Sequence, residues 1–170
     1  MLHAFDPGLS LGWAFVDADR PRSRLIDLWA SSEGAVYMRA RARLLEILNG
    51  GDVVAVEAAI MPNKVTIRSR LVLFGIRAMI VAVAHERMAR VVEVEPHRWR
   101  KHFIGVVSAP AGVPRKKRRQ WLKDRARWHA QQRGWGVVSE DEADALGILD
   151  YLRCTLDANY GALSTELMRA

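Results

Sequence analysis

Apolar residues in the first third of the chain fall into short runs separated by turn residues. The runs Leu2–Phe5, Leu11–Val16 and Leu25–Ala30 each have the length and composition of a strand. Pro7 and Gly8 favour a turn after the first run. Because parallel neighbours need a long crossover connection, three strands this close together predict an antiparallel meander.

The next segments alternate between helical and strand patterns. Ala35–Leu48 has the apolar spacing of a helix. Val53–Val56 is an unbroken apolar run that ends at Glu57, which predicts a strand covered on both faces, such as a central parallel strand. Val91–Glu95 reads as a further strand, so the sheet is predicted to gain parallel strands after the meander.

A long helix is predicted over Lys64–Met88. Its central part, Leu71–Ala84, is apolar on nearly every side and contains Arg77 as its one charged residue. A helix that is hydrophobic all round is usually buried all round. The sheet can cover only one side of it, so we expect a second copy of the chain to cover the other. Gly75 in mid-helix costs stability unless close packing requires it.

Three more helical segments complete the pattern. Pro96–Ile104 reads as a short helix and Arg115–Arg133 as a strongly basic one, while Ser139 and Glu142 have the spacing of a capping box that starts a third. Three strands, then alternating helix and strand, then helices predict an α/β fold with a mixed sheet. The length of 170 residues fits one domain, residues 1–170.

The chain has one cysteine, Cys154, so no disulfide within the chain is possible. Its place in an apolar helix predicts a buried thiol. No basic leader followed by an apolar core opens the sequence, and no stretch has the length of an uncharged membrane span. We therefore expect a soluble protein with no membrane partner in a reducing compartment, the cytoplasm.

Positive charge is concentrated in one segment. His97–Arg133 holds twelve Lys or Arg residues against one acid, a net charge of +11, whereas the whole chain carries +7. A single basic segment of this kind favours a polyanionic partner such as nucleic acid. Its most basic run is predicted to contact phosphate, with a nuclear-import signal as the alternative; the run is Arg115, Lys116, Lys117, Arg118 and Arg119.

The aromatic and histidine residues of this segment have ordinary explanations. Trp121 and Trp128 are seven residues apart on one helix face, which favours core packing over base stacking. His97, His102 and His129 have no metal-ligand spacing with one another, so contacts with solvent or phosphate are expected.

Four carboxylates each stand at the end of a predicted element. Asp6 follows the first strand and Glu57 the fourth, while Asp141 and Asp144 open the last helix, three residues apart and so on one face. Taken singly, an Asp before Pro-Gly is a common turn starter, and acids are frequent in a first helical turn. A carboxylate beside a buried strand, however, needs a partner or a metal.

The four acids together match the chemistry of phosphodiester hydrolysis. Three or four carboxylates without a thiol are the ligand set that Mg²⁺ prefers. Two divalent ions about 3.5–4 Å apart activate the attacking water and stabilise the leaving oxygen. Mn²⁺, another oxygen-preferring ion, is expected to substitute. The pattern therefore favours a metal-dependent nuclease.

Three motifs resemble those of the RuvC-type Holliday junction resolvases, which belong to the RNase H-like nuclease superfamily. They are Phe5-Asp6-Pro7-Gly8 followed by Gly12, Val54-Ala55-Val56-Glu57, and Asp141-Glu142-Ala143-Asp144-Ala145-Leu146, and their order and spacing agree over most of the chain. The resemblance implies a five-stranded mixed sheet flanked by helices, and a homodimer that cleaves four-way DNA junctions with Mg²⁺.

The resemblance also implies roles for individual residues. Asp6 would bridge two metal ions, Glu57 would hold one of them, and Asp144 with Asp141 would hold the other. Lys116 or Lys117 would come close to the scissile phosphate.

Two features depart from the family pattern and leave alternatives open. Ile60 stands where the cellular members have an aromatic residue that touches DNA bases, and the loop Val106–Pro114 with the basic run is longer and more basic, as in a phage-type or divergent member. A nuclease for other branched or single-stranded DNA or for RNA–DNA hybrids is one alternative, and a non-catalytic nucleic-acid-binding relative is another. A sugar-kinase-like ATPase would need a longer chain with two lobes.

Overall fold

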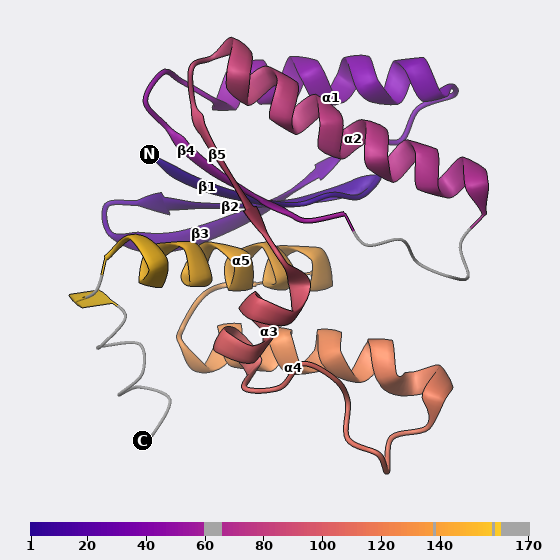
Figure 1. Ribbon diagram of the computed structural model, residues 1–170, viewed down its shortest axis with the longest axis vertical. Coiled ribbons are helices and arrows are strands. Elements are labelled where there is room, and N and C mark those ends of the chain that lie inside the picture. Colours follow the sequence, from indigo (N-terminus) through magenta and orange to yellow (C-terminus); the bar gives the residue numbers. More distant parts are fainter. Residues whose placement is uncertain (60–65, 138, 158, 161–170) are drawn as a thin grey trace.

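The computed structural model describes residues 1–59, 66–137, 139–157 and 159–160. Five strands form one sheet in the order β3-β2-β1-β4-β5 (Figure 1). The first three pair antiparallel, whereas β4 pairs parallel with both β1 and β5. This confirms the predicted mixed sheet. The strands are β1 (Leu2–Asp6), β2 (Ser10–Asp17), β3 (Arg20–Asp27), β4 (Val53–Glu57) and β5 (Arg90–Val94).

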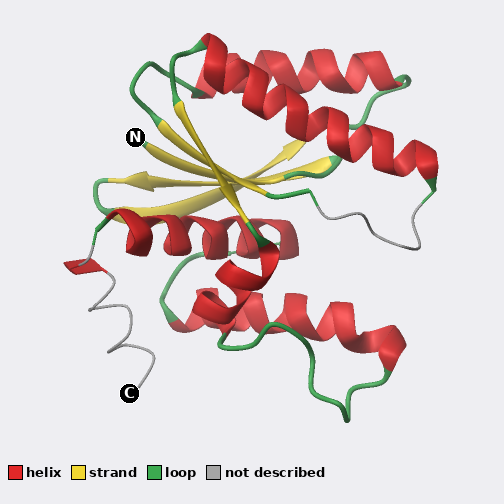
Figure 2. Ribbon diagram, viewed as in Figure 1, coloured by secondary structure: helices red, strands yellow, loops and turns green. Residues whose placement is uncertain are grey.

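Helices cover both faces of this sheet (Figure 2). On one face lie α1 (Glu33–Ile47) and α2 (Ile67–Glu86). On the other lie α3 (Pro96–Ile104), α4 (Arg118–Gln132) and α5 (Glu140–Leu156), with the 3-10 turn η1 (Arg115–Lys117) directly before α4. Each face has its own buried core, and α5 is the helix in direct contact with β1, β2 and β3. No helix in the described part of the chain is long and apolar enough to cross a membrane.

The third strand begins five residues earlier than the sequence predicts, at Arg20 instead of Leu25. Ala18 and Asp19 form a two-residue hairpin turn with positive φ angles of 46° and 68°. A turn of this type usually contains glycine or asparagine, so its sequence signal is weak here. The strand lies at the edge of the sheet and its first residues are polar, which removes the apolar alternation that would otherwise mark it.

Helix α2 is buried on one side only, as expected for a helix that the sheet of a single chain can cover from one side. Ile76, Ile80 and Val83 face the core, whereas Leu71 is 54% exposed. The tight packing expected at Gly75 is confirmed: a Cβ there would lie 2.2 Å from the ring of Tyr37 on α1. The first two residues of the predicted helix, and Ile60, lie outside the described residues.

Gly12 lets α5 approach the sheet closely. It pairs with Asp6 across β1 and β2, and a Cβ at this position would lie 2.1 Å from the carbonyl oxygen of Asp141. No side chain larger than hydrogen fits between that carbonyl and the strand. The first turn of α5 therefore lies directly over the end of β1.

We expect Gly12→Ala to destabilise the protein by about 1–3 kcal/mol or more, because overpacking a tight contact forces the backbone apart. Gly34→Ala is the matched control. Its Cβ would meet nothing within 4 Å, and alanine favours the helix by roughly 0.5–1 kcal/mol. Urea unfolding of both variants measures the difference. Equal stability of the two variants would mean that α5 does not need this close contact.

Candidate active site

Two of the four acids are brought together by strand pairing. Phe5 on β1 is paired with Val56 on parallel β4, so the next residues along each strand, Asp6 and Glu57, come side by side. Ala4 and Ala55, two residues before them, belong to the core on the α5 side. Because side chains alternate along a strand, Asp6 and Glu57 are directed to that same side.

The other two acids come from the start of α5. The predicted capping box is confirmed: the Ser139 hydroxyl accepts from the Glu142 amide at 3.1 Å, and the Glu142 carboxylate accepts from the Ser139 amide at 2.9 Å. This fixes where the helix begins and so directs Asp141 and Asp144 toward the strand ends. Asp144 is 6% exposed, while Asp141 is more open to solvent.

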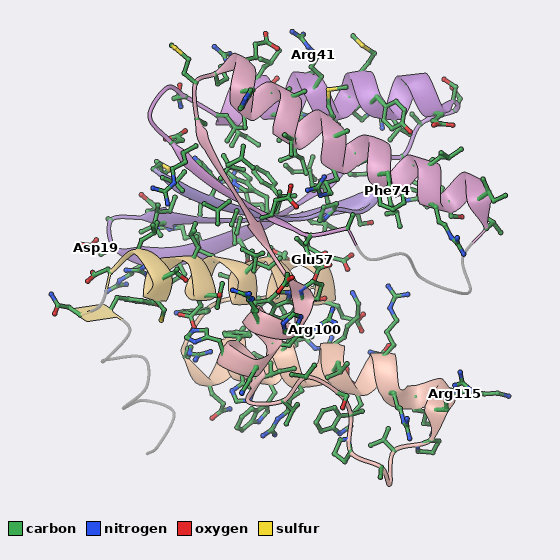
Figure 3. The ribbon with its side chains drawn as sticks, viewed as in Figure 1. Asp19, Arg41, Glu57, Phe74, Arg100 and Arg115 are labelled. Carbon is green, nitrogen blue, oxygen red and sulfur yellow. The ribbon has the colours of Figure 1, made fainter. Side chains whose placement is uncertain are left out.

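All four carboxylates line one open cavity of about 750 Å³. Its polar and charged wall also contains Ser10, Arg100, Ser108, Arg118, Arg119 and Lys123. Figure 3 shows Glu57 and Arg100 close together where the sheet meets the α3 and α4 layer. The four acids that the sequence singled out thus line the same cavity, although they come from three separate elements.

Burial, together with repulsion between the acids, raises the pKa values of two carboxyls in this cavity. Burial, followed by the charges of Asp144 and Glu57, holds the pKa of Asp6 well above its usual range. Burial is also the main cause that raises the pKa of Asp144 to about 7, against the lowering effect of Lys123 and Arg100. The cavity thus concentrates negative charge that its own cations only partly offset.

The donor set fits Mg²⁺ in chemistry, since it consists of carboxylate oxygens without thiols. Within the described ranges, however, no three His, Cys, Asp or Glu side chains are arranged as a group that could hold a metal ion. The four carboxylates surround the cavity without meeting at a common point, and an ammonium group lies among three acids of the α5 start.

That ammonium belongs to Lys123 on α4. Its Nζ lies 2.7 Å from Asp141 Oδ1, 3.7 Å from Asp144 Oδ2 and 3.7 Å from Glu140 Oε2, and the side chain is 15% exposed. The sequence pattern did not single out Lys123, and the family resemblance pointed to Lys116 or Lys117 instead. A usable signal was present, because Lys123 borders the inward-facing apolar positions of α4, Leu122, Ala126 and Ala130.

Helix α3 supplies two partners of Glu57 that the sequence also did not reveal. The indole Nε1 of buried Trp99 donates to Glu57 Oε1 at 2.9 Å, and Arg100 lies 3.6 Å from the same oxygen. These contacts hold the Glu57 carboxylate against the cavity wall.

Trp29, which is 62% exposed, also lines the cavity.

The predicted basic run divides into two parts. Arg118 and Arg119 line the cavity, whereas Arg115, Lys116 and Lys117 form the exposed turn η1. Figure 3 places Arg115 at the outer end of α4, away from Glu57. The run therefore extends from the cavity out to the surface.

Trp128 is not a core residue, which corrects the expectation from its spacing. It is 45% exposed, and the Arg125 guanidinium lies 4.8 Å from its ring centroid. Trp121 is half-buried. The core side of α4 is occupied by small residues instead, since α4 packs closely against α5.

A separate polar cluster joins α3 to the middle of α5. Buried Asp150 accepts from the Tyr160 hydroxyl at 2.6 Å and lies 2.9 Å from His102 Nε2. Burial opposes protonation of His102, but the hydrogen bond with Asp150 outweighs it and raises the pKa of His102 to about 9. His102 is therefore a half-buried structural cation and not the expected surface residue. Cys154 is partly exposed, so the predicted buried thiol is wrong.

Comparison with known proteins rests on structure. No family model and no curated protein sequence matches the chain. Thermus thermophilus RuvC solved in complex with a Holliday junction substrate is similar with a TM-score of 0.62 and 17% identity, covering 91% of this chain and 94% of that one. The fold is RNase H-like, as in RuvC.

Two further solved structures agree with this likeness. The Thermus thermophilus RuvC structure gives a TM-score of 0.58 at 20% identity, covering 94% of this chain and 96% of that one. The yeast mitochondrial Holliday junction resolvase Ydc2 gives 0.55 at 15% identity, covering 99% and 83%. The similarity to RuvC and Ydc2 therefore extends over most of the chain at low sequence identity.

The raised pKa of Asp144 predicts how stability depends on pH without metal. Its ordinary pKa is 3.8 and its folded pKa about 7. Between these values the folded chain holds a proton that the unfolded chain has released, so Asp144 makes the free energy of unfolding fall as pH rises from about 4 to 7. In EDTA, Asp144→Asn should therefore gain stability over the wild type, and gain more at pH 8 than at pH 5.

Urea unfolding at the two pH values measures this difference, and comparison with the wild type cancels other titrating groups. Asp19→Asn is the control, because Asp19 is exposed in the hairpin turn far from the cavity (Figure 3). An Asp144→Asn gain that is the same at both pH values would show that the carboxyl is not repelled in the folded protein.

Proposed function

We propose that this protein, as a single nuclease domain of residues 1–170, is a Mg²⁺-dependent endonuclease that resolves four-way DNA junctions by symmetric nicking. The observation that carries the proposal is the convergence of Asp6, Glu57, Asp141 and Asp144 on one cavity that also contains Arg118. Clustered carboxylates suit divalent metal ions, and the guanidinium group suits phosphate. The RNase H-like fold, as in RuvC, supports the same assignment.

Each acid has a proposed role. Asp6 is near enough to Asp144 and Glu57 for their charges to raise its pKa, and it would contact both ions. Glu57 would hold one ion, and Asp144 with Asp141 would hold the other. Bound Mg²⁺ supplies activation of the attacking water and charge stabilisation at the phosphoryl and leaving oxygens, and Mn²⁺ is expected to do the same.

The other cavity residues orient these ligands and the substrate. Trp99 and Arg100 fix the Glu57 carboxylate on the side of the cavity next to α3. Arg118 and Arg119 would contact the phosphate backbone at the cavity, and Arg115, Lys116 and Lys117 would extend this contact along the DNA. These side chains, and not the metal ions, would bind and orient the DNA strand.

We assign the active form to a homodimer. Ile67 and Leu71 on α2 are exposed in the single chain, which leaves an apolar surface beside the buried side of this helix. A two-fold contact through α2 would cover it and would place two cavities symmetrically, as paired nicks on opposite strands require. A DNA-acting protein of this kind is expected in the cytoplasm.

The test is incubation with labelled mobile four-way junctions, forks, duplexes and RNA–DNA hybrids, with Mg²⁺ or EDTA. We expect paired symmetric nicks in the junction with Mg²⁺ or Mn²⁺ and none in EDTA. Preferred cleavage of forks or hybrids would favour the nuclease for other branched or hybrid substrates. Binding to junctions without cleavage under any metal would favour the non-catalytic relative.

Asp6→Asn, Glu57→Gln and Asp144→Asn should each lower junction cleavage by about 100-fold or more, equivalent to roughly 2.7 kcal/mol of barrier. Each change removes a ligand charge at nearly constant shape. Binding to the junction, measured by gel shift in EDTA, should survive, because these acids repel phosphate when no metal is bound. Asp141→Asn should have a milder effect, since Asp141 is the more exposed of the two helix acids. Near-normal cleavage by Asp6→Asn and Glu57→Gln would overturn the metal role.

Replacing Lys116, Lys117 and Arg118 by Ala should weaken junction binding and flatten its salt dependence. Each lost phosphate contact should reduce the slope of log K against log salt concentration by about 0.9. A matched control removes Arg41, Arg43 and Arg90, three cations that belong to α1 and β5 and do not line the carboxylate cavity. An equal change of slope in both triple variants would mean that net charge, and not the basic run, determines binding.

A further inference from the structure

We propose that Lys123 is a displaceable internal cation: it neutralises the acids of α5 until divalent metal binds, and is then released toward the DNA phosphate. The inference rests on the proposed nuclease function and adds a coupling between metal and DNA that the four acids alone do not provide. It assigns a role to a residue that belongs to neither the acid set nor the basic run.

The first step is the contact geometry. The Lys123 ammonium lies within 3.7 Å of three carboxylates, and its shortest contact is 2.7 Å to Asp141 Oδ1. Asp144, one of these three acids, is almost fully buried, so its charge has little solvent to stabilise it. Lys123 and Arg100 are the cations that lower the pKa of Asp144 most strongly. Lys123 thus supplies positive charge where α5 concentrates negative charge.

The second step is competition. Asp141 and Asp144 are the acids proposed to hold one metal ion, and Lys123 contacts an oxygen of each. Two cations a few ångströms apart in a partly buried site repel each other strongly. The arrangement of the acids agrees with this, because within the described residues they surround the cavity and do not form a ready metal-ligand group. Metal binding therefore has to break the Lys123 contacts.

The third step is the position to which the side chain can move. Arg119 precedes Lys123 by four residues on α4, so the two lie on one face of the helix, and both line the cavity with Arg118. Lysine carries a compact charge on a flexible stem. A side-chain rotation, without movement of α4, can bring the released ammonium beside the arginines that would contact phosphate.

A reciprocal coupling follows from this exchange. DNA phosphate near the arginines attracts Lys123 away from the carboxylates and so raises metal affinity, and metal raises DNA affinity by the same factor. Without DNA, Lys123 keeps metal affinity low. The cavity would therefore gather its metal ions mainly when substrate is present.

The test uses Lys123→Met, which keeps the length of the side chain and removes its charge. Calorimetric titration with Ca²⁺ in the absence of DNA should show tighter binding than in the wild type, within the range of about 5- to 150-fold typical of coupled sites. A non-cleavable junction should tighten Ca²⁺ binding in the wild type and have a much smaller effect in Lys123→Met. Lys101→Met, on the exposed side of α3 and outside the cavity, is the matched control and should behave as wild type.

Lys123→Arg keeps the positive charge and should therefore bind Ca²⁺ as weakly as the wild type. Thermal melting of all variants in EDTA and in Ca²⁺ shows whether each one is folded. Unchanged or weaker Ca²⁺ affinity in folded Lys123→Met would overturn the proposal, as would a wild type that binds no divalent ion. Tighter binding in Lys123→Met by a protein that cleaves no substrate would support the lysine exchange while rejecting the proposed nuclease function. If the wild type cleaves the junction and Lys123→Met binds Ca²⁺ with unchanged affinity, the nuclease function would be supported and the lysine exchange rejected.

Discussion

Concentrated negative charge at the ends of two parallel strands is the constraint on which the rest of this structure depends. Asp6 and Glu57 are neighbours because β1 and β4 run parallel in register, and α5 adds Asp144 to the same cavity. Burial and repulsion raise the pKa values of Asp6 and Asp144, so the arrangement lowers the free energy of unfolding. A purely structural role would not require this loss of stability. Such a cost is typical of a site that binds cations.

Several local features exist to maintain this arrangement. The glycine at position 12 allows the Asp141 carbonyl to lie against β2, and the capping box fixes the first residue of α5. Trp99 on α3 contacts Glu57 at the cavity. The polar cluster around Asp150 joins α3 to the middle of α5. Apart from the capping box, which lies within α5, each of these contacts joins an element that carries one or more of the four acids to an element that carries none. The site therefore depends on how α3, α4 and α5 pack together on one face of the sheet.

The sequence predicted those features that local pattern determines. Apolar runs, turn residues and the capping box identified the strands, the mixed sheet and the four acids, because each acid ends a strand or lies near the start of a helix. It did not predict Lys123, Arg100 or Trp99 as partners of the acids, since their position depends on packing between helices that are distant in the chain. The polar edge strand β3 began earlier than expected because its pairing comes from a hairpin turn without glycine. Trp128 faced outward because small residues fill the contact between α4 and α5.

The central claim is that the four carboxylates form one site for divalent metal ions. The most direct measurement is Mn²⁺ binding by electron paramagnetic resonance, with the wild type compared with Asp6→Asn in the presence of a non-cleavable junction. We predict about two bound ions per wild-type chain, and weakened binding of both in Asp6→Asn, because the charges of both Glu57 and Asp144 act on Asp6. The same Mn²⁺ binding curve for both proteins, or no bound Mn²⁺ in the wild type, would contradict the claim.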